Sequence, residues 1–396
     1  MKYSLMGAVA AFTIGASFAG AQQLPVSVQA EYEEGFGYLS AVRELPDGRV
    51  LVADPLGQIL AAIDLKTGAM ETWGREGGGP GEWKQPDAVF ALPDGQTLLV
   101  DLGNGRLSTI ADDGTFLETY PIARGGGNAG GGRRGGGAAG GRRMVMSSPT
   151  MLLPRVIDSK GGIYFSARSF GSPNDSTTVT RATLESQETT AYGKVKPQEM
   201  RQSSTGAGNV QITPLPMTAR DDWAAGTDGT LVYVRSDGYY LEIVRPDGST
   251  VRGPEQDVDL LRPSDDDKVA YLERQSSAGI QMQMSMNTDG ERQMSMARGG
   301  GRGGDPDINQ LEWPSRMPAF RAGSTAVAPD GRIFVGRMVH AGDPSLFDIF
   351  DQNGKLVGHT EFGPNTSIVG FGANGVIYIT EADMFGLQWL KRVTVG

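Results

Sequence analysis

The chain has 396 residues, with 36 basic against 46 acidic side chains and a formal net charge of −10 at pH 7. This acidic balance argues against a general nucleic-acid surface or an anionic-membrane surface. The chain has no cysteine and only two histidines, which excludes disulfides, thiol nucleophiles, cysteine-zinc sites and metal centres built from several histidines.

The first 21 residues have the layout of a cleavable secretory signal. Lys2 is followed by an apolar run from Leu5 to Phe18, and the small residues at 19–21 precede Gln22. The run is too short to span a bilayer as a mature anchor, and no later segment is apolar enough to do so. We therefore expect a mature domain of residues 22–396 that is periplasmic or secreted and inserts into no membrane.

Six copies of a short pattern follow, each with a turn glycine and then a run of apolar and β-branched residues. Asp or Asn bonds the turn backbone and glycine accepts positive φ, so the pattern indicates hairpin turns. Each copy also follows one apolar segment and precedes another. The chain is therefore predicted to be all-β, with six four-stranded units that form a six-bladed β-propeller. The copies are DGRVLVAD (47–54), DGQTLLVD (94–101), GGIYFSAR (161–168), DGTLVYVR (228–235), DGRIFVGR (330–337) and NGVIYITE (374–381).

The last unit predicts how the ring closes. Residues 366–395 have room for three strands, and the segment 26–32 could add the fourth strand to the same sheet. A blade shared between the two ends of the chain leaves fewer strand edges exposed.

Two segments interrupt the repeats. Residues 124–143 are almost wholly glycine, alanine and arginine, which predicts a flexible loop. Residues 255–322 contain a predicted helix, with Ser264 as N-cap and three aspartates in its first turn, followed by a tract rich in Met and Gly. Both segments fall between the last strand of one blade and the first strand of the next, and we expect both on one face of the disc.

The second unit carries a more specific motif. A glycine-rich stretch, GREGGGPGEWKQP, ends at Pro86 and is followed by Asp101, Asn104, Arg106 and Leu107 at fixed spacing. This arrangement resembles the repeats of NHL-type six-bladed propellers, and the whole chain resembles secreted bacterial six-bladed propellers of undefined role. NHL-like propellers include binding scaffolds, and related six-bladed folds include metal-dependent lactonases and lyases, so the resemblance leaves both functions open.

The residue six places after the turn glycine is charged in all six copies. One fixed offset means one equivalent position per blade, near the channel mouth. These residues could pair across blades, with Asp101 bridging Arg168 and Arg337 bridging Glu381. Alternatively, they could form a polar mouth for an anionic ligand, because arginine forks onto carboxylate and phosphate. The candidate ligand-binding residues are Arg168, Arg235, Arg337 and His340, and the last could also act as a general base.

A bound calcium ion is a second possibility. Carboxylates from adjacent blades could hold it in the channel, where it would polarise a carbonyl. The candidate metal ligands are Asp54, Asp101, Glu381 and Asp383.

Methionines alternate along residues 282–286 and 294–296, and their thioethers suit Cu(I), but the same pattern is typical of a weak strand or a disordered tract. The arginine-glycine segment could contact polyanions or serve as a solvated linker.

Taken together, these patterns favour a binding module that recognises a peptide, a glycan or a small anionic ligand at the mouth face. The alternative is a metal-dependent hydrolase, lactonase or lyase with carboxylate ligands in the channel. A structural interaction module is the third possibility. No catalytic residue is assigned, no nucleic acid is expected as a partner, and the oligomeric state stays open.

Overall fold

The computed structural model describes residues 22–122, 124–125, 150–151, 153–167, 176–186, 188–204, 210–278, 280–286, 292–298 and 308–396. The expected signal at residues 1–21 and most of the arginine-glycine segment lie outside these residues, and both stay predictions.

Six antiparallel sheets form the six blades of a β-propeller, as the repeats predicted. The first strand of each blade faces the centre, where β3 lies beside β31 and β9, and β21 lies beside β15 and β27. Blade one contains β3 (Val42–Glu44), β4 (Val50–Asp54), β5 (Ile59–Ile63) and β6 (Met70–Thr72); blade two contains β9 (Pro86–Ala91), β10 (Thr97–Asp101), β11 (Arg106–Ile110) and β12 (Phe116–Pro121); blade three contains β15 (Val156–Ile157), β16 (Ile163–Ala167), β17 (Thr177–Ala182) and β18 (Thr190–Val195).

The second half of the ring follows the same order. Blade four contains β21 (Asp222–Ala225), β22 (Leu231–Arg235), β23 (Tyr240–Val244) and β24 (Thr250–Arg252); blade five contains β27 (Ala326–Val327), β28 (Ile333–Gly336), β29 (Pro344–Phe350) and β30 (Leu356–Pro364); blade six contains β31 (Thr366–Phe371), β32 (Val376–Ala382) and β33 (Gln388–Val395).

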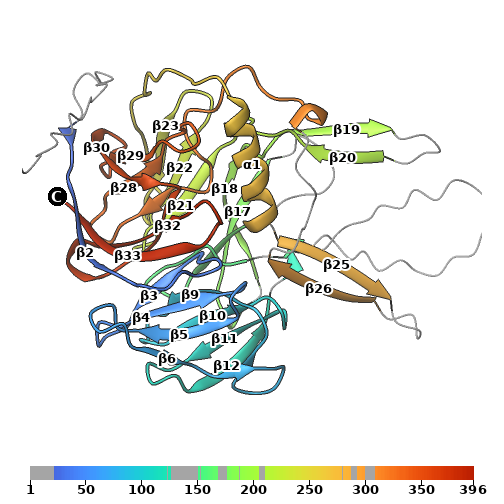
Figure 1. Cartoon of the computed structure of the whole chain (residues 1–396), viewed down its shortest axis with the longest axis vertical. Helices are drawn as coiled ribbons and strands as arrows, with labels where there is room; N and C mark the ends of the chain where they lie inside the picture. The colour runs from blue at the N-terminus through green and yellow to red at the C-terminus, as the bar shows by residue number, and fades with distance from the viewer. Residues whose placement is uncertain are drawn as a thin grey trace, which may run out of the picture.

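The N-terminal strand β2 (Val26–Glu31) completes blade six, which confirms the predicted closure. It pairs antiparallel with β33, with Val26 opposite Val395, and Figure 1 shows the two strands side by side. The preceding strand β1 (Gln22–Gln23) adds to blade five by pairing parallel with β30. The N-terminal segment therefore ties two neighbouring blades together.

Each hairpin between a first and a second strand turns on one glycine in the left-handed region. Its φ lies between +75° and +89° in all six blades, a conformation that side chains with a Cβ avoid. In blade three this glycine is Gly161, whereas the sequence alignment used Gly162. The residue six places after it is therefore Ala167, which ends β16, and not Arg168, which lies outside the described residues.

The core lies between neighbouring blades rather than in one central mass. Val52 of blade one packs with Tyr378 of blade six, and Leu98 of blade two packs with Phe165 of blade three. These side chains are at most 2% exposed, and burial of each contributes roughly 1.5–3 kcal/mol.

The predicted helix is present as α1 (Asp265–Ala278). Its first turn forms a capping box, because the Asp267 amide donates to Ser264 Oγ at 3.1 Å and the Ser264 amide donates to Asp267 Oδ2 at 2.7 Å. No helix in the described ranges is both long and apolar enough to cross a membrane.

Additional short elements interrupt the connections between blades. Two hairpins and α1 project from the same side of the propeller, as Figure 1 shows, and the first of these hairpins was not predicted. The two hairpins are β19 (Met200–Ser204) with β20 (Val210–Pro214), and β25 (Ile280–Met286) with β26 (Arg292–Arg298). The smaller elements are β7 (Arg75–Glu76), β8 (Glu82–Trp83), β13 (Arg124–Gly125), β14 (Thr150–Met151), η1 (Ile308–Gln310) and η2 (Ala373–Gly375).

Candidate functional site

Two of the strand-end carboxylates cap backbone. Asp54 is fully buried and accepts hydrogen bonds from the amides of Gly37 (2.6 Å) and Tyr38 (3.0 Å), which lead into blade one. It also accepts from the amides of Leu56 and Gly57 at 2.9 Å, in the turn after its own strand. Asp54 therefore fixes the loop before the first strand to the loop after the second.

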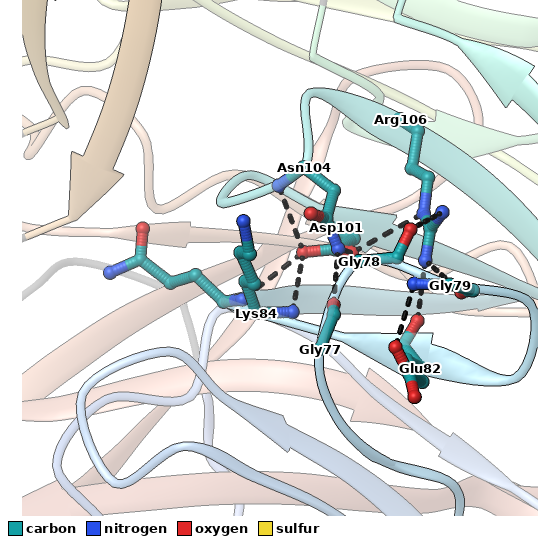
Figure 2. A network of polar contacts seen from close by, with 9 residues as sticks. Gly77, Gly78, Gly79, Glu82, Lys84, Asp101, Asn104 and Arg106 are labelled. Atoms are coloured by element: carbon teal, nitrogen blue, oxygen red, sulfur yellow. Dashed lines mark hydrogen bonds and ion pairs between the residues drawn. The ribbon is translucent and has the colours of Figure 1, made fainter.

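Asp101 has the same position in blade two, where Figure 2 shows its network. It is fully buried and accepts from the amides of Lys84 and Gln85 at 3.2 and 3.1 Å. Asn104 donates to Asp101 Oδ2 at 2.6 Å and to the Gly77 carbonyl at 2.9 Å. The motif that resembles NHL repeats therefore holds the glycine-rich crossover in place.

Arg106 completes this network. Its guanidinium donates to the carbonyls of Gly78 (3.2 Å) and Gly79 (3.1 Å), and it lies 3.5 Å from Asp101 Oδ2. The crossover glycines therefore present carbonyl oxygens to an arginine, which differs from a phosphate cradle of free amide groups.

The other strand-end charges pair inside their own blades. Arg235 contacts Asp221 and Glu242, each at 2.9 Å. The pairs in the next two blades are Arg337 with Asp348 at 3.3 Å and Glu381 with Lys391 at 2.6 Å. The expected interblade bridge between Arg337 and Glu381 is therefore replaced by bridges to the third strand of each blade. Arg168 lies outside the described residues, so the bridge expected between it and Asp101 stays a prediction.

The remaining carboxylate of the expected calcium site shapes a turn. Asp383 Oδ1 accepts from the amides of Phe385 and Leu387 at 2.8 and 2.9 Å. Across the described ranges, no group of three or more acidic or histidine side chains is placed so that it could hold a metal ion.

A cavity of about 320 Å³ lies beneath α1, on the face that carries the insertions. Three arginines line it: Arg220 from the segment before β21, Arg274 from α1, and Arg321 from the segment before β27. None of the three forms an ion pair with a carboxylate of the described residues. The repeats give no signal for these arginines, because Arg220, Arg274 and Arg321 stand in segments outside the repeated pattern.

The polar contacts of these arginines leave most of their donors available. Arg220 Nη1 lies 3.5 Å from Gln198 Oε1, and Arg321 Nη2 donates to the Thr366 carbonyl at 2.8 Å. Burial, together with the nearby charge of Arg274, lowers the pKa of Arg321 to about 10. The guanidinium is still charged at neutral pH and lies near the positive charge of Arg274, on which Asp267 and Glu273 act from a distance without forming an ion pair among the described residues.

The rest of the wall combines apolar and polar groups. Tyr271 of α1 accepts a hydrogen bond from Gln198 Nε2 at 3.0 Å and meets Trp313 edge to face at 5.9 Å between ring centroids. The apolar lining residues are Met217, Pro318, Phe320 and Met338.

A second, small cavity of about 30 Å³ shares Arg274 and Arg321 with the larger one. Arg337 and His340, both expected as ligand-binding residues, line it. His340 Nδ1 contacts Asp267 Oδ2 at 2.8 Å, and the Ala341 amide donates to Asp267 Oδ1 at 2.7 Å. The structure therefore brings two of the expected residues to the edge of the arginine cavity.

The central channel forms a further cavity of about 500 Å³, lined mainly by apolar side chains of the first strands. Arg43, Glu44, Arg155 and Asp158 are the charged residues in its lining, and Arg155 and Thr325, which also line it, are joined by Asp222 of blade four. Asp222 Oδ1 accepts from Arg155 at 3.0 Å, and Asp222 Oδ2 accepts from the Thr325 amide at 2.9 Å. The candidate calcium ligands Asp54, Asp101, Glu381 and Asp383 are not among the residues that line this cavity.

No protein-family model matches the chain, and no curated protein matches its sequence. Among solved structures, a member of the DUF4221 family from Bacteroides vulgatus is 9% identical with a TM-score of 0.49, over 95% of this chain and 99% of that chain. The calcium-binding protein regucalcin from Agrobacterium tumefaciens is 10% identical with a TM-score of 0.43, over 93% and 95%. A gluconolactonase from Xanthomonas campestris is 9% identical with a TM-score of 0.40, over 95% and 96%. These distant likenesses add nothing to the site described above.

Proposed function

We propose that the protein is an exported binding protein that holds a small organic anion in the arginine cavity. The observation that carries this proposal is the convergence of Arg220, Arg274 and Arg321 on one cavity without an ion-paired carboxylate among the described residues. Charged side chains brought together in this way repel one another, and an anion relieves the repulsion. The ligand class is a molecule with one carboxylate or phosphate group.

The cavity walls favour an anion that also has an apolar body. About 320 Å³ is at the lower end of the range of ligand cavities, roughly 300–1,000 Å³. Phe320 and Met217 are buried in the wall, and Met338 lies beside them. A bulky polymer would need a longer groove, so a small molecule fits better than a glycan or a folded peptide.

Arginine suits this task better than lysine. Its planar guanidinium presents parallel donors that match carboxylate and phosphate, and it stays charged when partly buried. Arg321 lies over the Phe347 ring, with its Cζ 5.8 Å from the ring centroid, which holds the group in one orientation. The anion would therefore meet a preorganised donor.

Export stays part of this proposal and rests on the sequence of residues 1–21. A metal-dependent hydrolase, the alternative, would need Asp54, Asp101, Glu381 and Asp383 as metal ligands. Each of these carboxylates instead accepts backbone hydrogen bonds or forms an ion pair within the protein. We therefore favour binding over catalysis.

Calorimetric titration of the protein with phenyl phosphate and benzoate tests the proposal, with benzyl alcohol as the uncharged probe. We expect one site that binds at least one of the two anions and does not bind the alcohol. Arg321→Gln and Arg274→Gln should each weaken binding roughly 10- to 100-fold, since hydrogen bonds to charged groups contribute about 1.5–3 kcal/mol.

Arg201→Gln provides the matched control. It removes the same charge from the same face, but Arg201 is paired with Glu312 at 2.9 Å and does not line the cavity. Affinity should not change in this variant. Binding of both anions with unaltered affinity in Arg321→Gln and Arg274→Gln, or equal binding of benzyl alcohol, would overturn the proposal.

A further inference from the structure

We propose that the central channel is a second binding site, which takes a neutral and largely apolar small molecule. Its cavity of about 500 Å³ falls within the usual range of ligand cavities, roughly 300–1,000 Å³. The channel and the arginine cavity share no lining residue. This second site is therefore separate from the first and does not depend on the proposed anion.

Apolar side chains from four blades line the channel and stay partly exposed. Phe90 of blade two, Val156 of blade three and Val327 of blade five each pack against a core cluster on one side and keep part of their surface uncovered. Ile368 and Phe371 of blade six do the same. Apolar surface that gathers in one cavity in this way favours an apolar ligand, which removes it from water.

The charged side chains of the lining are already satisfied within the protein. Two of them are positive and two are negative, so the lining has no excess charge for an ion to neutralise. An ionic ligand would lose its hydration without gaining a free counter-charge, which selects a neutral ligand. The contacts are Arg43 with Asp112, Arg155 with Asp222 and Asp158 with Arg181, each at 3.0 Å, and Glu44 with the Ala373 amide at 3.1 Å.

Two hydroxyl groups of the lining are also committed. Ser40 Oγ donates to the Asp87 carbonyl at 2.6 Å, and Thr325 Oγ1 donates to Asp222 Oδ2 at 2.5 Å. A hydrophilic ligand would have to break these bonds to use the same donors, and a broken bond to a buried group is costly. The polar groups of the channel therefore add to the preference for an apolar molecule.

The lining of the channel extends through the ring. It begins at Ser40 and Gly323, which precede the first strands of blades one and five, and reaches Pro93 and Pro329, in the turns that follow first strands. Both prolines are exposed. These turns stand at the opposite end of the first strands from the connections between blades, one of which carries α1. A ligand can therefore enter the channel without passing the arginine cavity.

Fluorescence titration of the full mature chain, residues 22–396, tests the proposal. The probe is N-phenyl-1-naphthylamine, a neutral aromatic molecule whose emission rises in apolar surroundings. We expect saturable binding of one probe per chain. Phenyl phosphate, which tests the arginine cavity, should not displace the probe.

Two variants fill the channel from different blades. Ala91 and Ala326 both line it and are not fully buried, so a larger side chain at either position narrows the cavity. Ala91→Trp and Ala326→Trp should each weaken probe binding roughly 10-fold or more, because the indole takes up space that the probe needs. Ala69→Trp is the matched control, since Ala69 is exposed in the turn between β5 and β6 and does not line the channel.

Circular dichroism establishes that each variant is folded, and either folded variant suffices for the comparison. Absence of saturable probe binding to the wild-type chain would overturn the proposal. Unchanged affinity in the folded filling variants would do so as well. Displacement of the probe by phenyl phosphate would place it in the arginine cavity and would equally refute a separate channel site.

Discussion

His340 Nδ1 lies 2.8 Å from Asp267 Oδ2, and this contact joins helix α1 to the loop between β28 and β29 of blade five. Asp267 is only 2% exposed, and its carboxylate also accepts bonds from Ser264 and from the Ala341 amide. One buried carboxylate therefore closes the helix cap and fixes the helix to the propeller. Because α1 carries Arg274 and Tyr271, this contact also positions one wall of the arginine cavity.

The pH dependence of stability should reveal this carboxylate. Burial alone would raise the pKa of Asp267, but the hydrogen bonds from Ser264, His340 and Ala341 outweigh it and lower the pKa to about 2. The unfolded chain has an aspartate pKa of about 3.9. The stabilisation of about 2 kcal/mol is therefore fully present above pH 4 and lost as the pH falls towards 2.

Asp267→Asn should remove this pH-dependent step in urea unfolding and weaken phenyl phosphate binding through a displaced α1. Asp265→Asn is the control, since Asp265 is 77% exposed in the same turn and pairs with Lys268 on the helix surface. If Asp267→Asn had the same free energy of unfolding as the wild type at both pH 3 and pH 7, the role assigned to Asp267 would be wrong.

Arg235 is expected to stabilise blade four rather than to bind a ligand. Its guanidinium contacts Asp221 and Glu242 and donates to the Lys194 carbonyl at 2.8 Å. Arg235→Ala should lower the free energy of unfolding by about 2 kcal/mol, because it removes the ion-pair partner of Asp221 and Glu242, although Asp221 keeps its hydrogen bonds from Lys196 and Ser236. Urea unfolding measures this loss, and Arg75→Ala, at an 80% exposed side chain, should have little effect. Lost phenyl phosphate binding at unchanged stability would restore the original mouth-site hypothesis.

The repeats predicted the fold because the signal for each blade is local. A turn glycine such as Gly48, and the alternation of the strand after it, are fixed by a few neighbouring residues. The partners of the strand-end charges are not local in this sense. Glu242 and Asp348 stand on the third strands of their blades, and the repeat does not specify how these strands align with the second strands. The interblade bridges were therefore expected only because the charges are opposite.

The arginine cavity could not be predicted for a related reason. Arg220 and Arg274 are separated by a whole blade in sequence, and Arg321 follows the long insertion. No repeat or spacing connects them, and only the docking of α1 brings them to one cavity. The turn glycine of blade three was placed one residue too late for a similar reason. Gly161 and Gly162 are adjacent, and the sequence allows either of them to be aligned with the turn glycines of the other blades.

Asp101 should behave as a structural residue. Asp101→Ala leaves the amides of Lys84 and Gln85 without their acceptor, and each unsatisfied buried donor costs about 1–3 kcal/mol. We expect thermal unfolding at a clearly lower temperature and unchanged affinity for phenyl phosphate. Asp113→Ala is the control, because the Asp113 carboxylate lies in an exposed turn, where it accepts a hydrogen bond from the Thr115 amide. Normal stability with loss of Ca²⁺ binding would instead support the metal hypothesis.

The closing strand should be as protected as the interior of the sheet. Terminal segments usually fray, but β2 pairs with β33 over Val26–Glu31, and the preceding strand β1 is anchored by its pairing with β30. Hydrogen exchange of the β2 amides that bond to β33 should therefore require the same opening free energy as exchange in β32. Fast exchange in β2 beside slow exchange in β32 would show that the ring does not depend on this closure.

Asp222 is expected to be the most sensitive single position among the contacts that join blades three, four and five. It is 3% exposed, and its carboxylate links Arg155 of blade three to Thr325 at the start of blade five. Asp222→Ala should therefore destabilise the ring by about 3–5 kcal/mol, the typical result of removing one partner of a buried ion pair.

Burial alone would raise the pKa of Asp222, but Arg155 and Thr325 outweigh it and hold the pKa below its usual value. The stabilisation is thus present above the unfolded pKa of about 3.9 and decreases as the pH falls below it. Urea unfolding of Asp222→Ala and of the control Asp228→Ala, an exposed turn aspartate of the same blade, measures the difference. Equal stability of the two variants at pH 7 would mean that the blades hold together without this link, because the apolar contacts between them suffice.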